Sequence, residues 1–222
     1  MLAHALPYMP SGVHLAVVDP GVGAEGPAGR RAVAVRTAEQ GHLLVGPDNG
    51  LLMLAAERFG GASEAVEISR SSERLEPVSR TFHGRDIFAP VAAALADGKP
   101  LAAVGEPCAP HELKRIELPT ARLSGGVLST HVLSADHFGN LTLDASSSQL
   151  AQTGLRLGDA LSVDVNGRIF TARYSSTFAD VAEGELLLYE EATGMVALAV
   201  NLGSAAELLG AARDTKLLVR TR

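Results

Sequence analysis

Three short segments of the sequence combine charged or polar side chains with glycines, and each has residue types that carry chemistry. The first, Asp19–Gly23 (DPGVG), interrupts an apolar run that begins at Val13. The second is Thr81–Asp86 (TFHGRD), and the third is Asp136–Asn140 (DHFGN). Ligands of open α/β sheets lie outside the carboxyl ends of strands, and glycines let a ligand approach the backbone closely. An acid such as Asp19 at a strand end is therefore a candidate for catalysis or binding.

Each segment also has a purely structural interpretation. Asp19 is compatible with a turn residue, Asp86 with the N-cap of a helix, and Asn140 with another turn. Other chemistries find little support, because the sequence has no His-x-His, His-Glu-x-x-His, cysteine pair or Gly-x-Ser-x-Gly. The single Cys108 has no evident base beside it. The sequence alone predicts no metal site and leaves the role of the three segments open.

The overall composition is that of a globular protein with a substantial core. The chain has 222 residues, of which 46% are hydrophobic and 20% charged, and its formal charge is −6. No basic run is present, which argues against a nucleic-acid partner. No apolar segment has the length of a membrane span, and the N-terminus lacks the features of a signal peptide. With one cysteine and no intrachain disulfide, a cytoplasmic location is expected.

The elements that must position these segments follow from hydrophobic patterns. Alternating strand and helix patterns predict an α/β domain over residues 1–118, with a mostly parallel sheet and helices. The expected strands are Val13–Val18, Ala32–Arg36, His42–Val45 and Glu64–Ser69, and the expected helices are Leu51–Arg58 and Asp86–Asp97. Prolines and paired glycines between Cys108 and Gly126 are typical of a linker.

A second domain is predicted over residues 119–222, and its pattern is that of a small antiparallel β domain. The expected strands are Val127–Leu133, Leu141–Leu143, Ala160–Val165, Arg168–Tyr174, Glu185–Leu188 and Met195–Val200, followed by a helix near Ala205–Arg213. Asn166-Gly167 separates two of these strands and is a hairpin turn signal.

Taken together, the segments resemble one family, the S-adenosyl-L-methionine (SAM) hydrolases, also called SAM hydroxide adenosyltransferases and related to fluorinases and chlorinases. The matching pieces occur in the family's order: VHLAVVDPGVG, RRAVAVRT, VGPDNGLL, TFHGRDIFAPVAA, DHFGN and GMVALAVNLGSAAELLG. The resemblance implies an α/β domain followed by a β-barrel-like domain. It also implies a homotrimer whose active sites lie at subunit interfaces, with SAM as the substrate and no cofactor.

The family's reaction is the cleavage of SAM by water to adenosine and methionine, and the resemblance implies the residues that hold the water. They are an Asp–Arg–His triad that matches Asp19, Arg30 and His83, with Arg31 as the alternative arginine. Either the Asp–His pair accepts the water's proton or the arginine stabilises a hydroxide. The halogenating relatives lack Asp-Pro-Gly-Val-Gly, which makes a halogenase the less favoured alternative.

The resemblance also implies residues that bind the substrate. Asp136 matches the acid that meets the methionine ammonium, and Phe138 and Asn140 match positions at the adenosine end. Phe178 lies near the aromatic residue that stacks on adenine, and Phe82 is expected on the ribose side.

The sequence departs from the family at three places. The family's first strand, which ends in Thr-Asp-Phe-Gly and whose acid holds the ribose hydroxyls, is not in this sequence. A misplaced start, a truncated form and a catalytically impaired SAM- or adenosine-binding paralogue are the open explanations. Glu190–Gly194 replaces a serine-rich turn that grips the methionine carboxylate, and Leu143-Asp144 replaces Asn-Ile.

Overall fold

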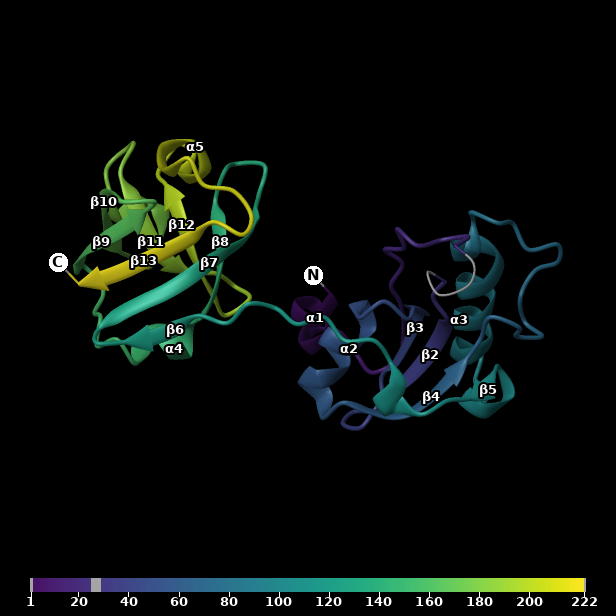
Figure 1. Cartoon of the computed structure of the whole chain (residues 1–222). Coiled ribbons are helices and arrows are strands. Elements are labelled where there is room, and N and C mark those ends of the chain that lie inside the picture. Colours follow the sequence, from purple (N-terminus) through teal and green to yellow (C-terminus); the bar gives the residue numbers. More distant parts are fainter. Residues whose placement is uncertain (1, 25–28, 222) are drawn as a thin grey trace. The chain divides into compact units, whose positions relative to one another are not determined.

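The computed structural model describes residues 2–24 and 29–221, and the chain divides into two compact units, Met1–Glu117 and Leu118–Arg222 (Figure 1). The N-terminal unit is built on one sheet with the strand order β1-β3-β2-β4-β5. The strands are β1 (Val13–Leu15), β2 (Ala32–Thr37), β3 (Leu43–Pro47), β4 (Ala62–Glu67) and β5 (Glu106–Pro107), and the α-helices are α1 (Leu2–Ala5), α2 (Leu51–Ala56) and α3 (Ala89–Ala96).

Helices cover both faces of this sheet, which explains why residues 32–35 of β2 are all buried. Ala32 and Ala34 face the helix α3 in one apolar cluster, whereas Val33 and Val35 face α2 in another. Alternation of side chains along a strand sends successive residues to opposite faces, so a run of four apolar residues needs cover on both faces. The α/β class predicted for this half is therefore confirmed (Figure 1).

The strand directions correct one detail of that prediction, because the sheet is mixed. Among the described residues of this sheet, β1 and β3 pair in parallel, whereas β3–β2, β2–β4 and β4–β5 are antiparallel. Gln40 and Gly41 have φ values of 58° and 64° in the short connection between β2 and β3. Such a tight turn joins antiparallel neighbours, since a parallel pair needs a crossover of about a dozen residues or more.

The first strand is shorter than the expected Val13–Val18 and ends at Leu15. The N–H of Ala16 still donates to the carbonyl of Val45, at 2.9 Å. The next bond of a parallel ladder needs an N–H from residue 47, which is a proline and has none. Asp19 therefore lies beyond the sheet and not at the last position of a strand.

The C-terminal unit is a closed β-barrel, which confirms the barrel predicted for this half. One pairing departs from the antiparallel pattern that was expected, because residues 172–174 and 186–188 pair in parallel. Its strands run in the order β13-β9-β10-β11-β12-β8-β7, and β13 pairs with β7 to close the ring. They are β6 (Arg122–Ser124), β7 (Val127–Ala135), β8 (Leu141–Ser146), β9 (Ala160–Val165), β10 (Arg168–Tyr174), β11 (Leu186–Glu190), β12 (Met195–Val200) and β13 (Lys216–Thr221), and the helices are α4 (Ser147–Ala151) and α5 (Ala205–Leu209). The strand β6 lies within the segment that was expected to be a linker.

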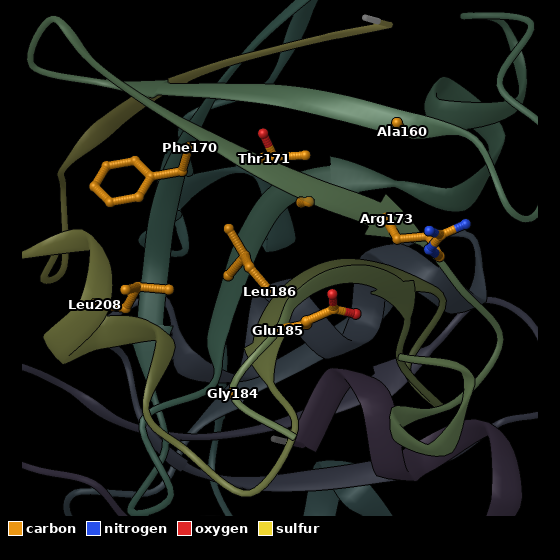
Figure 2. Close-up of a pocket in the computed structure, with 9 residues that line it drawn as sticks. Ala160, Phe170, Thr171, Arg173, Gly184, Glu185, Leu186 and Leu208 are labelled. Atoms are coloured by element: carbon orange, nitrogen blue, oxygen red, sulfur yellow. The ribbon is translucent and has the colours of Figure 1, made fainter. Parts of the chain in front are cut away.

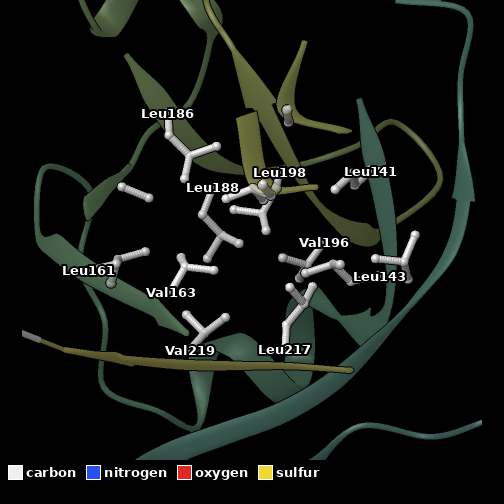
Figure 3. Close-up of a cluster of buried hydrophobic side chains, with 14 of the residues drawn as sticks. Leu141, Leu143, Leu161, Val163, Leu186, Leu188, Val196, Leu198, Leu217 and Val219 are labelled. Carbon is white, nitrogen blue, oxygen red and sulfur yellow. The ribbon is translucent and has the colours of Figure 1, made fainter. Parts of the chain in front are cut away.

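Strand β13 is one of the elements that the sequence patterns missed, and its apolar residues complete the barrel core. Leu217 and Val219 point into the interior together with Leu198 and Val163 (Figure 3). Leu217 is paired with Thr130 of β7 and is fully buried.

We expect Leu217→Ala to lower the free energy of unfolding by about 2–5 kcal/mol, because a buried leucine is replaced by a cavity. Urea denaturation followed by circular dichroism measures this change. Leu157→Ala is the matched control, since that side chain is 60% exposed, and we expect a change of less than about 0.5 kcal/mol. Equal effects of the two substitutions would contradict the role of β13 in the core.

Candidate active site

The structure brings Asp19, Arg30 and His83 together in the N-terminal unit. Arg30 Nε lies 3.0 Å from Asp19 Oδ1 and 2.9 Å from Oδ2, and Arg30 Nη2 also pairs with Oδ2. The same Nη2 lies 3.0 Å from Nδ1 of His83. The side chains of Asp19 and Arg30 are each only 6% exposed. Arg30 is thus the central group, with the carboxylate and the imidazole bound to one edge of its guanidinium.

The contact with Arg30 fixes the protonation state of His83. A guanidinium has only donors, so Nδ1 of His83 accepts and the neutral ring carries its proton on Nε2. Burial lowers the pKa of His83 and the positive charge of Arg30 lowers it further, against the opposing effects of Asp19 and Asp86. His83 therefore presents an N–H donor to the surroundings of the triad.

Local structure explains how these side chains are held. His83 immediately precedes a π-helical turn, Gly84–Phe88, which continues into α3. This turn places the fully buried ring of Phe88 against the guanidinium of Arg30, 5.1 Å from its centroid. Cation–π contact and the carboxylate together hold Arg30 from two sides. π-Helical turns occur frequently at functional sites.

Arg31, the alternative arginine, has other partners. Its Nε donates to Asp48 Oδ2 at 2.9 Å, and its Nη2 donates to the carbonyl of Glu112 at 3.1 Å. Successive side chains of an extended chain point to opposite sides, so Arg30 and Arg31 cannot share one site. Arg30 is the arginine in contact with Asp19 and His83.

The residues around His83 differ in their exposure. The ring of Phe82 is 57% exposed, and the guanidinium of Arg85 lies over it at 4.9 Å. Asp86 is buried and accepts hydrogen bonds from Arg85 and from the backbone N–H of Ser79. Asp86 is therefore not the helix N-cap that its position suggested, because its carboxylate ties down the preceding loop.

In the C-terminal unit, Asp136 organises the loop between β7 and β8. Its Oδ1 accepts from the backbone N–H groups of Phe138 and Asn140, and its Oδ2 accepts from the Asn140 side chain, each at 2.9 Å. Burial raises the pKa of Asp136, but the hydrogen bonds from Asn140 and Phe138 outweigh that effect and the pKa is lowered. Asp136 is thus a carboxylate that stays charged, and the ring of Phe138 beside it is exposed.

Phe178 lies on the barrel with an aromatic neighbour that the sequence did not single out. Its ring centroid is 5.2 Å from that of Tyr189. Burial raises the pKa of the Tyr189 hydroxyl, and the charges of Glu191 and Asp136 raise it further. Glu191 in turn accepts from the hydroxyl of Thr142 at 2.6 Å. Asp136, Tyr189 and Phe178 therefore belong to one polar and aromatic region of the barrel, and the sequence signal for Tyr189 was an aromatic residue in an otherwise aliphatic strand.

One pocket on the barrel is separate from the predicted site residues. It is a pocket of about 240 Å³ on the barrel, formed by β10, β11 and α5 (Figure 2). Its lining residues are Ala160, Phe170, Thr171, Ala172, Arg173, Gly184, Glu185, Leu186 and Leu208. This pocket contains none of Asp19, Arg30 and His83, so the candidate site is defined by the contacts among those three side chains.

Within residues 2–24 and 29–221, no three His, Cys, Asp or Glu side chains are placed together to bind a metal ion. Over the same part of the chain, no helix has the length and apolar character that crossing a membrane requires.

Comparison with known proteins identifies the class to which this fold and site belong. The models of the SAM hydroxide adenosyltransferase N-terminal and C-terminal domains match residues 1–105 and 130–217. The chain therefore belongs to the SAM hydroxide adenosyltransferase family.

Relatives of the chain carry two kinds of name. The (R)-S-adenosyl-L-methionine hydrolase of Salinispora tropica is 48% identical over 99% of this chain and 78% of that protein. A fluorinase of an Actinoplanes species is 32% identical over 81% of this chain and 61% of that protein. The crystal structure of an uncharacterized conserved protein from Thermotoga maritima superposes with a TM-score of 0.88 and 32% identity, covering 98% of this chain and 80% of that one.

Proposed function

We propose that the protein hydrolyses SAM to adenosine and L-methionine, with the triad of Asp19, Arg30 and His83 holding the attacking water. The observation that carries the proposal is the convergence of a carboxylate and an imidazole on one edge of a buried guanidinium. Similarity to proteins named (R)-S-adenosyl-L-methionine hydrolase supports the substrate and the reaction.

The chemistry explains why these three groups suit the reaction. Attack at the ribose C5′ breaks the C5′–S bond of a sulfonium, and the electron pair leaves on a neutral thioether that needs no acid. The difficulty is the nucleophile, because water must lie in line with that bond and lose a proton as it attacks. Since Arg30 occupies the Nδ1 lone pair of His83, the carboxylate of Asp19 takes the proton. The positive charge of Arg30 and the Nε2–H of His83 then stabilise the attacking oxygen.

The C-terminal unit supplies the binding groups in this proposal. The charged Asp136 binds the methionine ammonium, Asn140 reads an edge of the adenine, and Phe138 and Phe178 stack on it. From the N-terminal unit, Phe82 contacts the ribose. The family resemblance supports a homotrimer without a cofactor, in which the N-terminal unit of one subunit and the C-terminal unit of the next form each site. The single cysteine supports a cytoplasmic location.

Incubation of the purified protein with SAM tests the proposal. Chromatography should show adenosine and methionine in equal amounts, and in heavy-oxygen water the label should enter the 5′-hydroxyl of adenosine. Binding of SAM without release of adenosine would replace the hydrolase proposal with that of a binding protein.

The lowered pKa of His83 predicts a pH dependence. We expect kcat/KM for adenosine formation to remain above half of its plateau value at pH 6.5, the ordinary pKa of histidine, and to fall to half only at a lower pH. A rate that has already halved at pH 6.5 would contradict a neutral, Arg30-bound His83.

The free energy of unfolding should also depend on the titration of His83. Below pH 6.5 the unfolded chain binds a proton at His83 that the folded chain does not yet bind, so the free energy of unfolding falls as the pH falls through this range. His83→Asn keeps an acceptor for Arg30 but has no titrating ring, so its melting temperature should fall less on acidification. The lowered pKa of His14 contributes equally in both proteins.

A further inference from the structure

The turn that follows β3 is bonded to the sequence neighbours of two triad residues. The side-chain Nδ2 of Asn49 donates to the carbonyl of Val18 at 2.8 Å, and Val18 immediately precedes Asp19. The backbone N–H of Asp48 donates to the carbonyl of Arg31 at 2.9 Å. The carboxylate of Asp48 also accepts from the Arg31 side chain at 2.9 Å.

The segment that carries Asp19 depends on such a contact because it has left the sheet. Pairing with β3 ends after Ala16, and the side chain of Val18 is 66% exposed. Neither β-ladder bonds nor deep burial fix the carbonyl of Val18. The Asn49 amide ties this carbonyl back to the end of β3.

The turn is itself anchored, so it can transmit a fixed geometry. Asp48 Oδ1 accepts from the backbone N–H of Lys114 at 2.8 Å, and the Asp48 side chain is 4% exposed. Asn49 Oδ1 accepts from the N–H of Leu51, the first residue of α2, at 3.2 Å. Both side chains are thus tied at one end to the body of the unit and at the other to a neighbour of the triad.

We propose that Asp48 and Asn49 are positioning residues that set the separation between Asp19 and Arg30. This inference rests on the proposed function for its effect on rate, but the geometry it invokes exists in the substrate-free protein. Asn49 holds the chain before Asp19, and Asp48 holds the chain after Arg30. A loss of either contact lets the carboxylate and the guanidinium drift relative to His83.

Asn49→Ser tests the proposal without changing the charge of the protein. A serine hydroxyl can still accept from the N–H of Leu51 in a turn but is too short to reach the carbonyl of Val18. We expect kcat for adenosine formation to fall about 10- to 100-fold with KM changed less than about threefold, because small misplacements of catalytic groups cost rate. Asn166→Ser makes the same change in the exposed hairpin turn between β9 and β10 and should leave kcat unchanged.

The pKa of His83, followed by NMR of its ring without substrate, gives a second readout that does not need turnover. In Asn49→Ser it should rise toward its ordinary value, because the charge of Arg30 is held less firmly against Nδ1. An unchanged His83 pKa with only a lower melting temperature would overturn the positioning role. If the wild-type protein forms no adenosine, the proposed function fails, and the His83 pKa still decides the role of Asn49.

Discussion

Asp19→Asn is expected to lower kcat for the hydrolysis of SAM by about 10³-fold. The amide keeps the size of the side chain but removes the group that takes the proton of water in the proposed mechanism. It also leaves the guanidinium of Arg30, which is only 6% exposed, without its counter-charge. Neutralising one partner of a buried ion pair should lower the free energy of unfolding by about 3 kcal/mol. Adenosine release and urea denaturation measure the two effects separately.

A second Asp–Arg pair provides the control for this substitution. Asp214 lies 3.9 Å from Arg213, and both side chains are more than three-quarters exposed. Asp214→Asn should change neither kcat nor the free energy of unfolding by a measurable amount, because exposed ion pairs contribute little. Adenosine release by Asp19→Asn at more than a tenth of the wild-type rate would rule out Asp19 as the proton acceptor.

Arg30→Lys is expected to lower kcat about 10²-fold even though the positive charge is kept. The guanidinium reaches both Asp19 oxygens and Nδ1 of His83 from one planar group, and a lysine ammonium has no such fork. The carboxylate and the imidazole then lose their shared donor. Rates of adenosine formation at saturating SAM measure this loss.

Arg31→Lys makes the same chemical change one residue further along the chain and should cost at most about tenfold. The lysine can still pair with Asp48, and the bond between the Asp48 N–H and the carbonyl of residue 31 is untouched. Comparison of the two variants tests the choice of arginine directly. A larger loss in Arg31→Lys than in Arg30→Lys would reverse the assignment.

The sequence pattern does not distinguish Arg30 from Arg31 as the arginine that contacts Asp19 and His83. The segments around Asp19 and His83 combine polar residues with glycines, and the family resemblance gives them a role, but two adjacent arginines after a glycine-rich stretch are equivalent as a pattern. Only the direction of each side chain from the extended backbone distinguishes them. That direction depends on how β2 is seated between β3 and β4, which is a property of the packed sheet.

The class of the fold could be predicted from the sequence, but the predicted pairing of the strands in the N-terminal sheet was wrong. Apolar runs and glycine turns located most strands, because burial and turn chemistry are local properties of the sequence. The antiparallel β2–β3 pairing depended on a turn at Gln40-Gly41 that carries no strong hairpin signal at its first position. The positioning contacts of Asp48 and Asn49 could not be predicted, because their partners Val18 and Arg31 lie far away in the sequence.

The closure of the barrel by its last strand has a consequence for synthesis of the chain. Strand β13 fits between β7 and β9, pairing Leu217 with Thr130 on one side and with Val165 on the other. Until residues 216–221 have left the ribosome, β7 and β9 have open edges, which are prone to pair with other chains. The last strand of the N-terminal unit is synthesised about a hundred residues before β13. The N-terminal unit can therefore fold before the barrel closes. Nascent chains stalled before Lys216 should therefore be protease-resistant in the first unit and bound by chaperones at the second.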